Sequence, residues 1–216
     1  MDIEQARFNM IEQQIRPWEV LDASVLAVLG KVRREDFVPE AYKDLAFADI
    51  QIPIAQDQVM MEPKVEARMV QELNIDPHDM VLEIGTGSGY VTAMLGSLAA
   101  HVTSVEIHKE LSEAASSRLS QSGVSNFSLV VEDAAAGYGD ADQFDAILLS
   151  GSVPSVPQKF FDALKEGGRL VAVVGTGPVM EAIRYEKSAG EIASQSLFDT
   201  VLPPLENVVV PKSFVF

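Results

Sequence analysis

The stretch Val81-Leu82-Glu83-Ile84-Gly85-Thr86-Gly87-Ser88-Gly89-Tyr90 decides the fold. In it an apolar run ends in three glycines at alternate positions, and a helix-like apolar segment at residues 91–98 follows. This order predicts a strand, a tight turn and the start of a helix. Glycines let the backbone of such a turn pass close to a ligand, and the helix N-terminus offers free N–H donors. The stretch is therefore typical of an α/β protein that binds a nucleotide-like molecule at this turn.

The spacing of the glycines narrows the choice of ligand. It reads G-x-G-x-G, whereas dinucleotide-binding folds have G-x-G-x-x-G, so a dehydrogenase is disfavoured. Glu83 precedes the turn, and Glu106 ends the next apolar run. A carboxylate at the position of Glu106 can accept hydrogen bonds from both ribose hydroxyls of a nucleoside. This pair of acidic residues fits S-adenosylmethionine better than NAD.

From residue 80 onward, near-continuous apolar runs alternate with helix-like segments. We expect strands at Met80–Ile84, His101–Val105, Phe127–Val131, Phe144–Leu149 and Arg169–Val174, and helices at Tyr90–Leu98, Lys109–Gln121 and Pro157–Leu164. Such apolar runs are typical of parallel strands covered on both faces. The alternation predicts an α/β fold with a doubly wound, mostly parallel, Rossmann-like sheet. We expect residues 185–210 to add antiparallel strands at one edge.

Residues 1–77 read differently and are predicted to form an N-terminal helical extension ahead of a core at residues 78–216. We expect helices in Asp2–Gln14, after the capping residue Asp22, and from Pro63 onward. Residues 37–61 look irregular. The extension and the core should pack as one compact unit, and the sequence leaves open whether the extension moves as a lid.

The charge of the chain disfavours several classes of partner. Its 16 Lys and Arg residues face 32 Asp and Glu residues, which gives a net charge of −16. Such a surface repels phosphate backbones and anionic membranes, so we expect no nucleic acid and no membrane as partner. The oligomeric state stays open.

The absence of cysteine and the positions of the histidines limit the chemistry. Without cysteine there is no disulfide and no thiol catalysis, and the three histidines show no metal-ligand spacing, so we expect no metal. The acidic N-terminus lacks the apolar core of a signal peptide, and no apolar run is long enough to span a membrane. We therefore expect a cytoplasmic protein.

Polar or glycine-rich segments follow four predicted strands and should meet at one edge of the sheet, where ligands bind in such folds. They are Gly85–Gly89, Glu106, Glu132-Asp133 and Ser150-Gly151-Ser152. Asp133 could accept a hydrogen bond from an adenine amino group, or be a plain turn residue. Glu83 could support the turn, or reach the amino group of the methionine part. The predicted cofactor-binding residues are Glu83, Gly85, Thr86, Gly87, Gly89, Glu106 and Asp133.

At these residues the chain resembles the protein-L-isoaspartate O-methyltransferase family, and the resemblance runs over nearly the whole chain. The similar segments are Met10–Ile15, Val32–Pro39, Ala41–Asp44, Leu82–Tyr90, Phe144–Ile147 and Leu164–Val171. The N-terminal segments are the most specific of them. The resemblance implies transfer of a methyl group from S-adenosylmethionine to the free carboxylate of an isoaspartyl residue in damaged proteins or peptides. The product of the cofactor would be S-adenosylhomocysteine.

This chemistry explains why no catalytic histidine or cysteine stands out. A carboxylate with a pKa of about 4 is already ionised at neutral pH, so it needs no general base. The enzyme has to align the carboxylate, the methyl group and the sulfur, and to keep water out. We therefore assign no catalytic residue from the sequence.

The predicted acceptor loop departs from the family pattern. The family has Gly-Gln-Thr-Ile-Ser-x-Pro, whose hydroxyls hold the isoaspartyl group, whereas residues 57–63 read Asp-Gln-Val-Met-Met-Glu-Pro. Val59 and Met61 thus replace two hydroxyl donors, and a hydrogen bond to a charged group is worth about 1.5–3 kcal/mol. The acceptor-site candidates are Gln58, Met61, Ser150 and Ser152. In one interpretation the pocket is rebuilt for another acceptor, and Ser150 and Ser152 supply the lost donors. In the other, the methionines pack into the core and isoaspartyl activity is weak or absent.

Two further hypotheses remain open. The protein could keep the cofactor and methylate another acceptor, either a small molecule or a different peptide carboxylate. It could also be a cofactor-binding module without isoaspartyl activity. A closed apolar pocket at Met60-Met61 would favour a small acceptor, and an open groove would favour a polypeptide.

Overall fold

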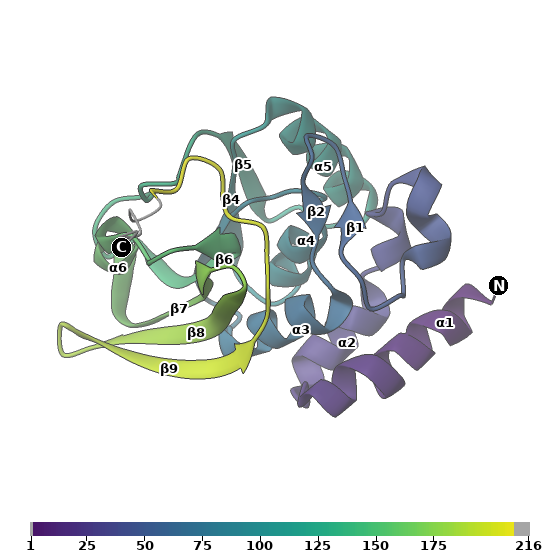
Figure 1. The fold of residues 1–216 in the computed structure, drawn as a ribbon, viewed down its shortest axis with the longest axis horizontal. Helices are drawn as coiled ribbons and strands as arrows, with labels where there is room; N and C mark the ends of the chain where they lie inside the picture. Colours follow the sequence, from purple (N-terminus) through teal and green to yellow (C-terminus); the bar gives the residue numbers. More distant parts are fainter. Residues whose placement is uncertain (1, 210–216) are drawn as a thin grey trace, which may run out of the picture.

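The computed structural model describes residues 2–209, and its core is one seven-stranded sheet (Figure 1). The strands are β3 (Met80–Ile84), β4 (His101–Glu106), β5 (Phe127–Val131), β6 (Phe144–Val153), β7 (Leu164–Thr176), β8 (Val179–Ser188) and β9 (Glu191–Asp199). They lie in the order β5-β4-β3-β6-β7-β8-β9. Strands β3 to β7 run parallel, and β8 and β9 are antiparallel to their neighbours. The predicted α/β fold with a mostly parallel sheet is confirmed.

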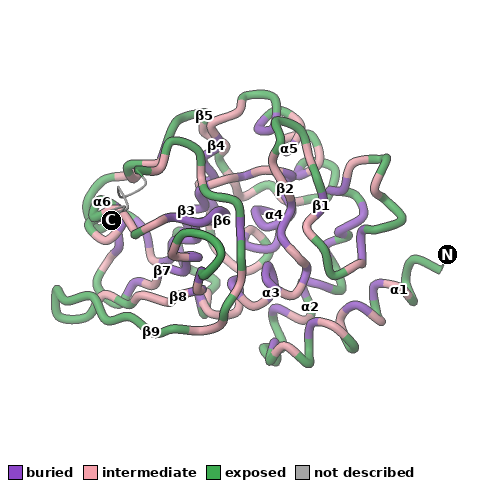
Figure 2. The backbone as a smooth tube through the Cα atoms, viewed as in Figure 1, coloured by how far each residue is buried: buried purple, intermediate pink, exposed green. Residues whose placement is uncertain are grey.

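Many residues of the central strands are buried (Figure 2), and the apolar side chains of the sheet divide between two clusters. Successive residues of a strand point to opposite faces, so Val81 and Leu82 belong to two different apolar clusters. Helices α4 (Tyr90–Gly96) and α5 (Lys109–Gln121) contribute to the cluster of Val81, and α6 (Gln158–Ala163) contributes to that of Leu82. The strands are therefore covered on both sides, as their apolar runs require.

The N-terminal extension is helical, as predicted. Helix α1 (Ile3–Met10) continues through η1 (Ile11–Ile15) and η2 (Arg16–Trp18), and α2 (Ala23–Lys31) and α3 (Pro63–Glu72) follow. The Asp22 carboxylate accepts hydrogen bonds from the N–H groups of Ser24 and Val25, which caps α2. Pro63 stands in the first turn of α3, where its missing N–H costs nothing. Residues of this extension share one apolar cluster with residues of the sheet.

Residues 37–61, which look irregular in the sequence, contain the 3-10 helix η4 (Glu40–Leu45) and a short antiparallel hairpin. Strand β1 (Ile52–Pro53) pairs with β2 (Val59–Met60). At the tip of the hairpin, Gln56 and Asp57 have positive φ angles of 61° and 55°. Non-glycine residues seldom adopt this conformation. Because no glycine stands at these two positions, the sequence lacks the residue that usually indicates such a turn.

Strands β6 and β7 are longer than predicted, because an irregularity joins two stretches of their ladder. Phe144 pairs with Leu164 and Ala146 pairs with Arg169, so residues 165–168 bulge out of the pairing. The apolar run itself begins only at Leu170, which is why the sequence pattern indicated a later start. The helix before β7 is correspondingly shorter than predicted.

The antiparallel strands at the edge begin at Val179, earlier than the predicted start at residue 185, and end at Asp199. Strand β8 alternates between buried and exposed residues at its start, so it carries no continuous apolar run. Residues 200–209 leave the sheet and cross toward the carboxyl ends of the parallel strands (Figure 1). Residue 210, the last of the predicted range, lies outside the described residues.

Among residues 2–209 we find no helix that combines the length and the apolar character needed to cross a membrane.

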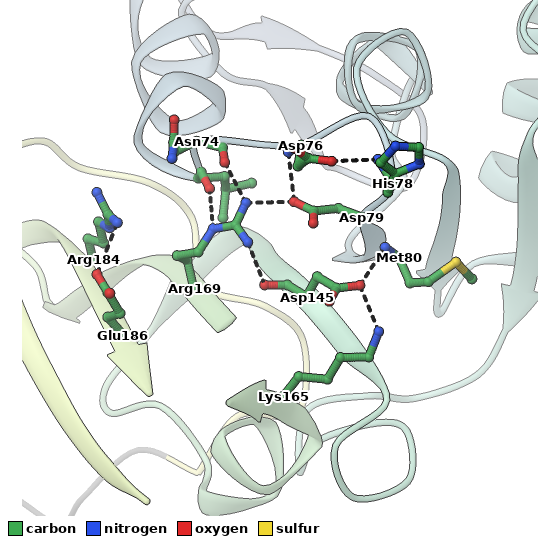
Figure 3. A network of polar contacts seen from close by, with 11 residues as sticks. Asn74, Asp76, His78, Asp79, Met80, Asp145, Lys165, Arg169, Arg184 and Glu186 are labelled. Atoms are coloured by element: carbon green, nitrogen blue, oxygen red, sulfur yellow. Dashed lines mark hydrogen bonds and ion pairs between the residues drawn. The ribbon is translucent and has the colours of Figure 1, made fainter. Parts of the chain in front are cut away.

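A polar network fastens the segment between α3 and β3 to the neighbouring strands β6 and β7 (Figure 3). Arg169 of β7 donates to the carbonyl of Leu73 at 2.7 Å and to the Asp79 carboxylate at 2.6 Å. The Asp145 carboxylate accepts from the N–H of Met80 and from Lys165, both at 2.8 Å. These contacts hold the end of the extension against the start of β3.

We expect Arg169→Gln to lower the free energy of unfolding by about 3 kcal/mol, because the variant leaves largely buried acceptors and Asp79 without their cation. The matched control is Arg184→Gln on the neighbouring strand, where the arginine pairs with half-exposed Glu186 at 3.1 Å. That change should cost about 1 kcal/mol or less. Urea unfolding of both variants measures the difference, and equal losses would contradict the role of the network.

Candidate active site

The glycine turn between β3 and α4 has the backbone conformation that only glycine adopts readily. The φ angles of Gly85, Gly87 and Gly89 are +93°, +52° and +88°. A Cβ at Gly89 would lie 3.1 Å from the Cβ of Ala115 in α5, and one at Gly85 would lie 3.5 Å from the Cβ of Ser150. The turn is thus fitted between α5 and the end of β6, and its backbone borders the pocket described next.

A pocket opens at the carboxyl ends of the parallel strands and has an empty volume of about 740 Å³, counting the space open to solvent. Five of the predicted cofactor and acceptor residues come from strand ends and line it together: Gly85, Gly87, Glu106, Asp133 and Ser150. The four strand ends β3, β4, β5 and β6 therefore meet as predicted. Gln58 and Met61 of the predicted acceptor loop line the same pocket.

Glu106 ties the glycine turn to the end of β4. One carboxylate oxygen accepts from the N–H of Gly87 at 2.8 Å, and the other accepts from the N–H of His108 at 3.0 Å. The side chain is almost fully buried yet borders the pocket. Each carboxylate oxygen has a second lone-pair site, so Glu106 can still accept hydroxyl groups of a ligand.

Asp133 follows β5 and also borders the pocket. Its Oδ1 accepts from the N–H of Ala135 at 2.9 Å, which is the turn role that the sequence left open. Its Oδ2 accepts from the side-chain amide of Asn207 at 2.8 Å, a contact that no sequence pattern indicated. Free lone pairs of Asp133 remain available toward the pocket.

Glu83 lies one layer behind the turn and is fully buried. It accepts hydrogen bonds from the hydroxyls of Thr92, Ser104 at 2.7 Å and Ser150 at 3.4 Å. Burial raises the pKa of Glu83 to about 7, although these hydroxyls favour the charged form. Among the described residues that line the pocket, neither Glu83 nor Thr86 nor Gly89 occurs. Their placement suits support of the turn, which was one of the two roles considered for Glu83.

The hairpin β1–β2 and the segment Leu202–Glu206 form the remaining walls of the pocket. The side-chain amide of Gln58 donates to the Glu206 carboxylate at 2.9 Å, and the ring nitrogen Nε2 of His108 lies 2.7 Å from the same oxygen. Glu206 therefore joins the hairpin, the end of β4 and the segment Leu202–Glu206. Sequence reasoning missed this segment, because only the Pro203-Pro204 break marks it in the sequence.

Within residues 2–209, no group of three or more His, Cys, Asp or Glu side chains is placed to hold a metal ion.

A comparison with protein-family models matches residues 5–208 to the family "Protein-L-isoaspartate(D-aspartate) O-methyltransferase". The chain belongs to this family. A protein-L-isoaspartate O-methyltransferase of Methanoculleus marisnigri is 38% identical over 199 residues, which cover 92% of this chain and 90% of the relative. The enzyme of the same name from Rhodopseudomonas palustris is 43% identical over 166 residues, 77% of this chain and 76% of the relative. The predicted class, an S-adenosylmethionine-dependent protein carboxyl methyltransferase, is confirmed.

Solved structures support the same fold. A protein-L-isoaspartate O-methyltransferase matches with a TM-score of 0.79 and 22% identity over 94% of this chain and 65% of the other. A second match, from Plasmodium falciparum, has a TM-score of 0.78 and 19% identity over 95% of this chain and 99% of the other. That protein was solved in complex with S-adenosyl-L-homocysteine.

Two serines that were candidates for the acceptor site of this methyltransferase have different surroundings. Ser150 borders the pocket and donates to Glu83. Ser152 is buried, and its hydroxyl donates to the carbonyl of Leu202 at 2.9 Å, while its N–H donates to that of Pro203. The structure therefore places Ser152 outside the pocket, where it holds the segment Leu202–Glu206 in position.

The residues that replace the family hydroxyls are in the pocket wall. Val59 is half-buried, and Met61 is only 4% exposed, yet both border the pocket. Met61 also belongs to the large apolar cluster of the extension. Met61 therefore packs into the core and at the same time forms part of the pocket surface.

The buried carboxyl of Glu83 makes the stability of the methyltransferase depend on pH. Since its pKa in the folded chain lies above the ordinary value of 4.5, its stabilising contribution is full below about pH 4.5 and is lost as the pH rises through about 7. Between pH 5 and pH 8, the wild type should lose about 2 kcal/mol of unfolding free energy relative to Glu83→Gln. Urea unfolding at both pH values measures this, with Glu191→Gln on the exposed edge strand as control. Parallel pH profiles of wild type and Glu83→Gln would refute it.

Proposed function

We propose that this protein transfers a methyl group from S-adenosylmethionine to the free carboxylate of isoaspartyl residues in polypeptides. The single observation that carries the proposal is the pocket itself. Its lining joins the glycine turn and Glu106 on one side to the loop of Gln58 and Met61 on the other. A methyl transfer needs these two partners aligned in one water-excluding site. Family membership and the names of the relatives support the same reaction.

The charge of the residues that line the pocket suits S-adenosylmethionine. We propose that the backbone of Gly85 and Gly87 borders the cofactor, that Glu106 accepts its ribose hydroxyls and that Asp133 lies beside its adenine. Glu83, Thr86 and Gly89 would support the turn from behind. When bound, S-adenosylmethionine supplies the methyl group on a positively charged sulfur. Four carboxylates and no Lys or Arg are among the described lining residues, which suits a cationic ligand.

The acceptor side would be formed by the N-terminal extension together with the segment Leu202–Glu206 of the core, and the strand ends of the core would form the cofactor side. Ser150 and Gln58 are the polar side chains we propose for the acceptor carboxylate. Gln58 donates to Glu206 in the structure, so an acceptor would have to exchange with that carboxylate. Met61 and Val59 would contact the apolar part of the acceptor.

A second candidate function is methylation of another carboxylate, either of a small molecule or of a different peptide. The observation that favours it is the apolar lining of the acceptor side, where Ile54, Val59, Met61 and Leu205 border the pocket. Neither valine nor methionine can donate the hydrogen bonds that hydroxyls would give to a carboxylate.

The test is methyl transfer from labelled S-adenosylmethionine to an isoaspartyl peptide, with the ordinary aspartyl peptide as control, alongside calorimetry of S-adenosylhomocysteine binding. We expect transfer to the isoaspartyl peptide alone. Binding without transfer would reject the isoaspartyl acceptor and favour the second candidate.

We also expect Glu106→Gln to weaken S-adenosylhomocysteine binding at least tenfold, since an amide accepts fewer hydroxyl bonds than a carboxylate. Unchanged affinity would contradict the proposed role of Glu106.

Restoring one hydroxyl tests the acceptor side directly. Val59→Thr is nearly the same in shape and adds a donor at the pocket wall, so kcat/KM for the isoaspartyl peptide should rise about tenfold or more. Val179→Thr, at a residue that is 77% exposed and away from the pocket, is the matched control and should change nothing. Steady-state kinetics with both variants measures this. A fall in kcat/KM of Val59→Thr would mean that the acceptor prefers an apolar wall.

A further inference from the structure

A buried arginine outside the pocket contacts the segments that form its walls. Arg34 is fully buried in the 3-10 helix η3 (Arg34–Asp36). Its Nη2 donates to the carbonyl of Met61 at 2.9 Å, and its Nε donates to the carbonyl of Ala46 at 2.9 Å. Its Nη1 pairs with the carboxylate of Glu66 in the first turn of α3. One side chain thereby contacts the chain before the hairpin β1–β2, the residue that follows the hairpin, and the helix α3.

The same guanidinium also lies over the ring of Tyr90, the residue that follows the glycine turn. The central carbon of the group is 4.9 Å from the centre of the Tyr90 ring, a distance typical of a cation–π contact. Tyr90 is the first residue of α4 and directly follows Gly89 of the glycine turn. Arg34 therefore bridges the acceptor loop and the helix that begins at the cofactor turn.

Stability alone does not require a charge at this place. Two ions buried together lose their hydration, and apolar side chains of similar volume often stabilise a core equally well. Glu66 shows this loss of hydration, because burial raises the pKa of its carboxyl to about 7 in spite of the neighbouring arginine. An apolar side chain could not donate in fixed directions to two carbonyls and a carboxylate, whereas the planar guanidinium does so.

We propose that Arg34 is a positioning residue for the methyl transfer, fixing the acceptor loop at Met61 relative to the glycine turn at Tyr90 without touching acceptor or cofactor. The inference rests on the proposed function. Misplacement of reacting groups by about 1 Å can cost roughly 100-fold in rate, so a residue that only holds a loop can control the reaction.

The test removes both partners together, so that no unpaired charge stays buried. In Arg34→Met/Glu66→Leu we expect kcat/KM for the isoaspartyl peptide to fall at least tenfold, while the dissociation constant of S-adenosylhomocysteine changes less than threefold. A folded double variant with unchanged kcat/KM overturns the proposal. Arg34→Lys keeps a charge opposite Glu66 but lacks the planar fork, so it should lose activity to an intermediate degree.

The chain offers a matched control in the same extension. Arg7 and Glu35 form another buried ion pair, with side chains 5% and 8% exposed, and within the described residues neither makes a hydrogen bond to the acceptor loop. Arg7→Met/Glu35→Leu should keep kcat/KM within threefold of the wild type. Equal losses in the two double variants would show general destabilisation and overturn the positioning role.

Hydrogen exchange separates this inference from the proposed function and needs no turnover. The backbone N–H groups of residues 58–61 should exchange at least tenfold faster in Arg34→Met/Glu66→Leu, and at the wild-type rate in the Arg7 control. If the wild type fails to methylate the isoaspartyl peptide, the proposed function fails while this measurement still reports on the loop. If the wild type is active and exchange of the loop is unchanged, Arg34 has no positioning role. If the double variant does not fold, Arg34→Lys carries the same two measurements.

Discussion

The hydrogen bond from the N–H of Gly87 to the Glu106 carboxylate is the contact on which the rest of the site depends. It can form only because the chain turns back at three glycines in left-handed conformations, where a side chain would be strained or would strike α5. The bond aligns the end of β4 with the end of β3. The pocket, the start of α4 and the position of Tyr90 all follow from that alignment.

Around this turn the protein places carboxyl groups in two very different settings. Glu106 accepts two backbone N–H groups at the pocket edge, whereas Glu83 lies behind the turn among hydroxyls and is fully buried. The first arrangement fixes the carboxylate between the glycine turn and the end of β4. In the second, burial disfavours the charged form of Glu83, and hydrogen bonds from hydroxyls of β4, α4 and β6 partly offset this effect.

Most of the fold could be predicted from local signals in the sequence. The bounds of β3 and β5 and the cap at Asp22 match the expectation, because apolar runs, glycines and capping side chains act on their own neighbours. Contacts between distant segments were not predictable. Nothing near Arg34 distinguishes it from Arg33, yet the Arg34 side chain is 0% exposed and that of Arg33 is 56% exposed. Met61 and Glu66 come into contact with Arg34 only in the folded chain.

The candidate site follows the same rule. Gly85, Glu106 and Asp133 stand at strand ends, so topology alone brings them together, and the sequence located them. The roles of Ser150 and Ser152 differ because β6 continues past the predicted end, and this buries Ser152 against the segment at Leu202. The sequence could not indicate that a segment 50 residues further along the chain covers Ser152.

The position of the segment Leu202–Glu206 late in the sequence has a consequence for folding during translation. The glycine turn, Glu106 and the hairpin emerge from the exit tunnel long before the segment Leu202–Glu206, which completes the pocket through Ser152, Gln58 and His108. A nascent chain that has folded its five parallel strands but not this segment lacks one wall of the pocket. The pocket is complete only after the segment Leu202–Glu206 has been translated and has docked against the hairpin and the end of β6.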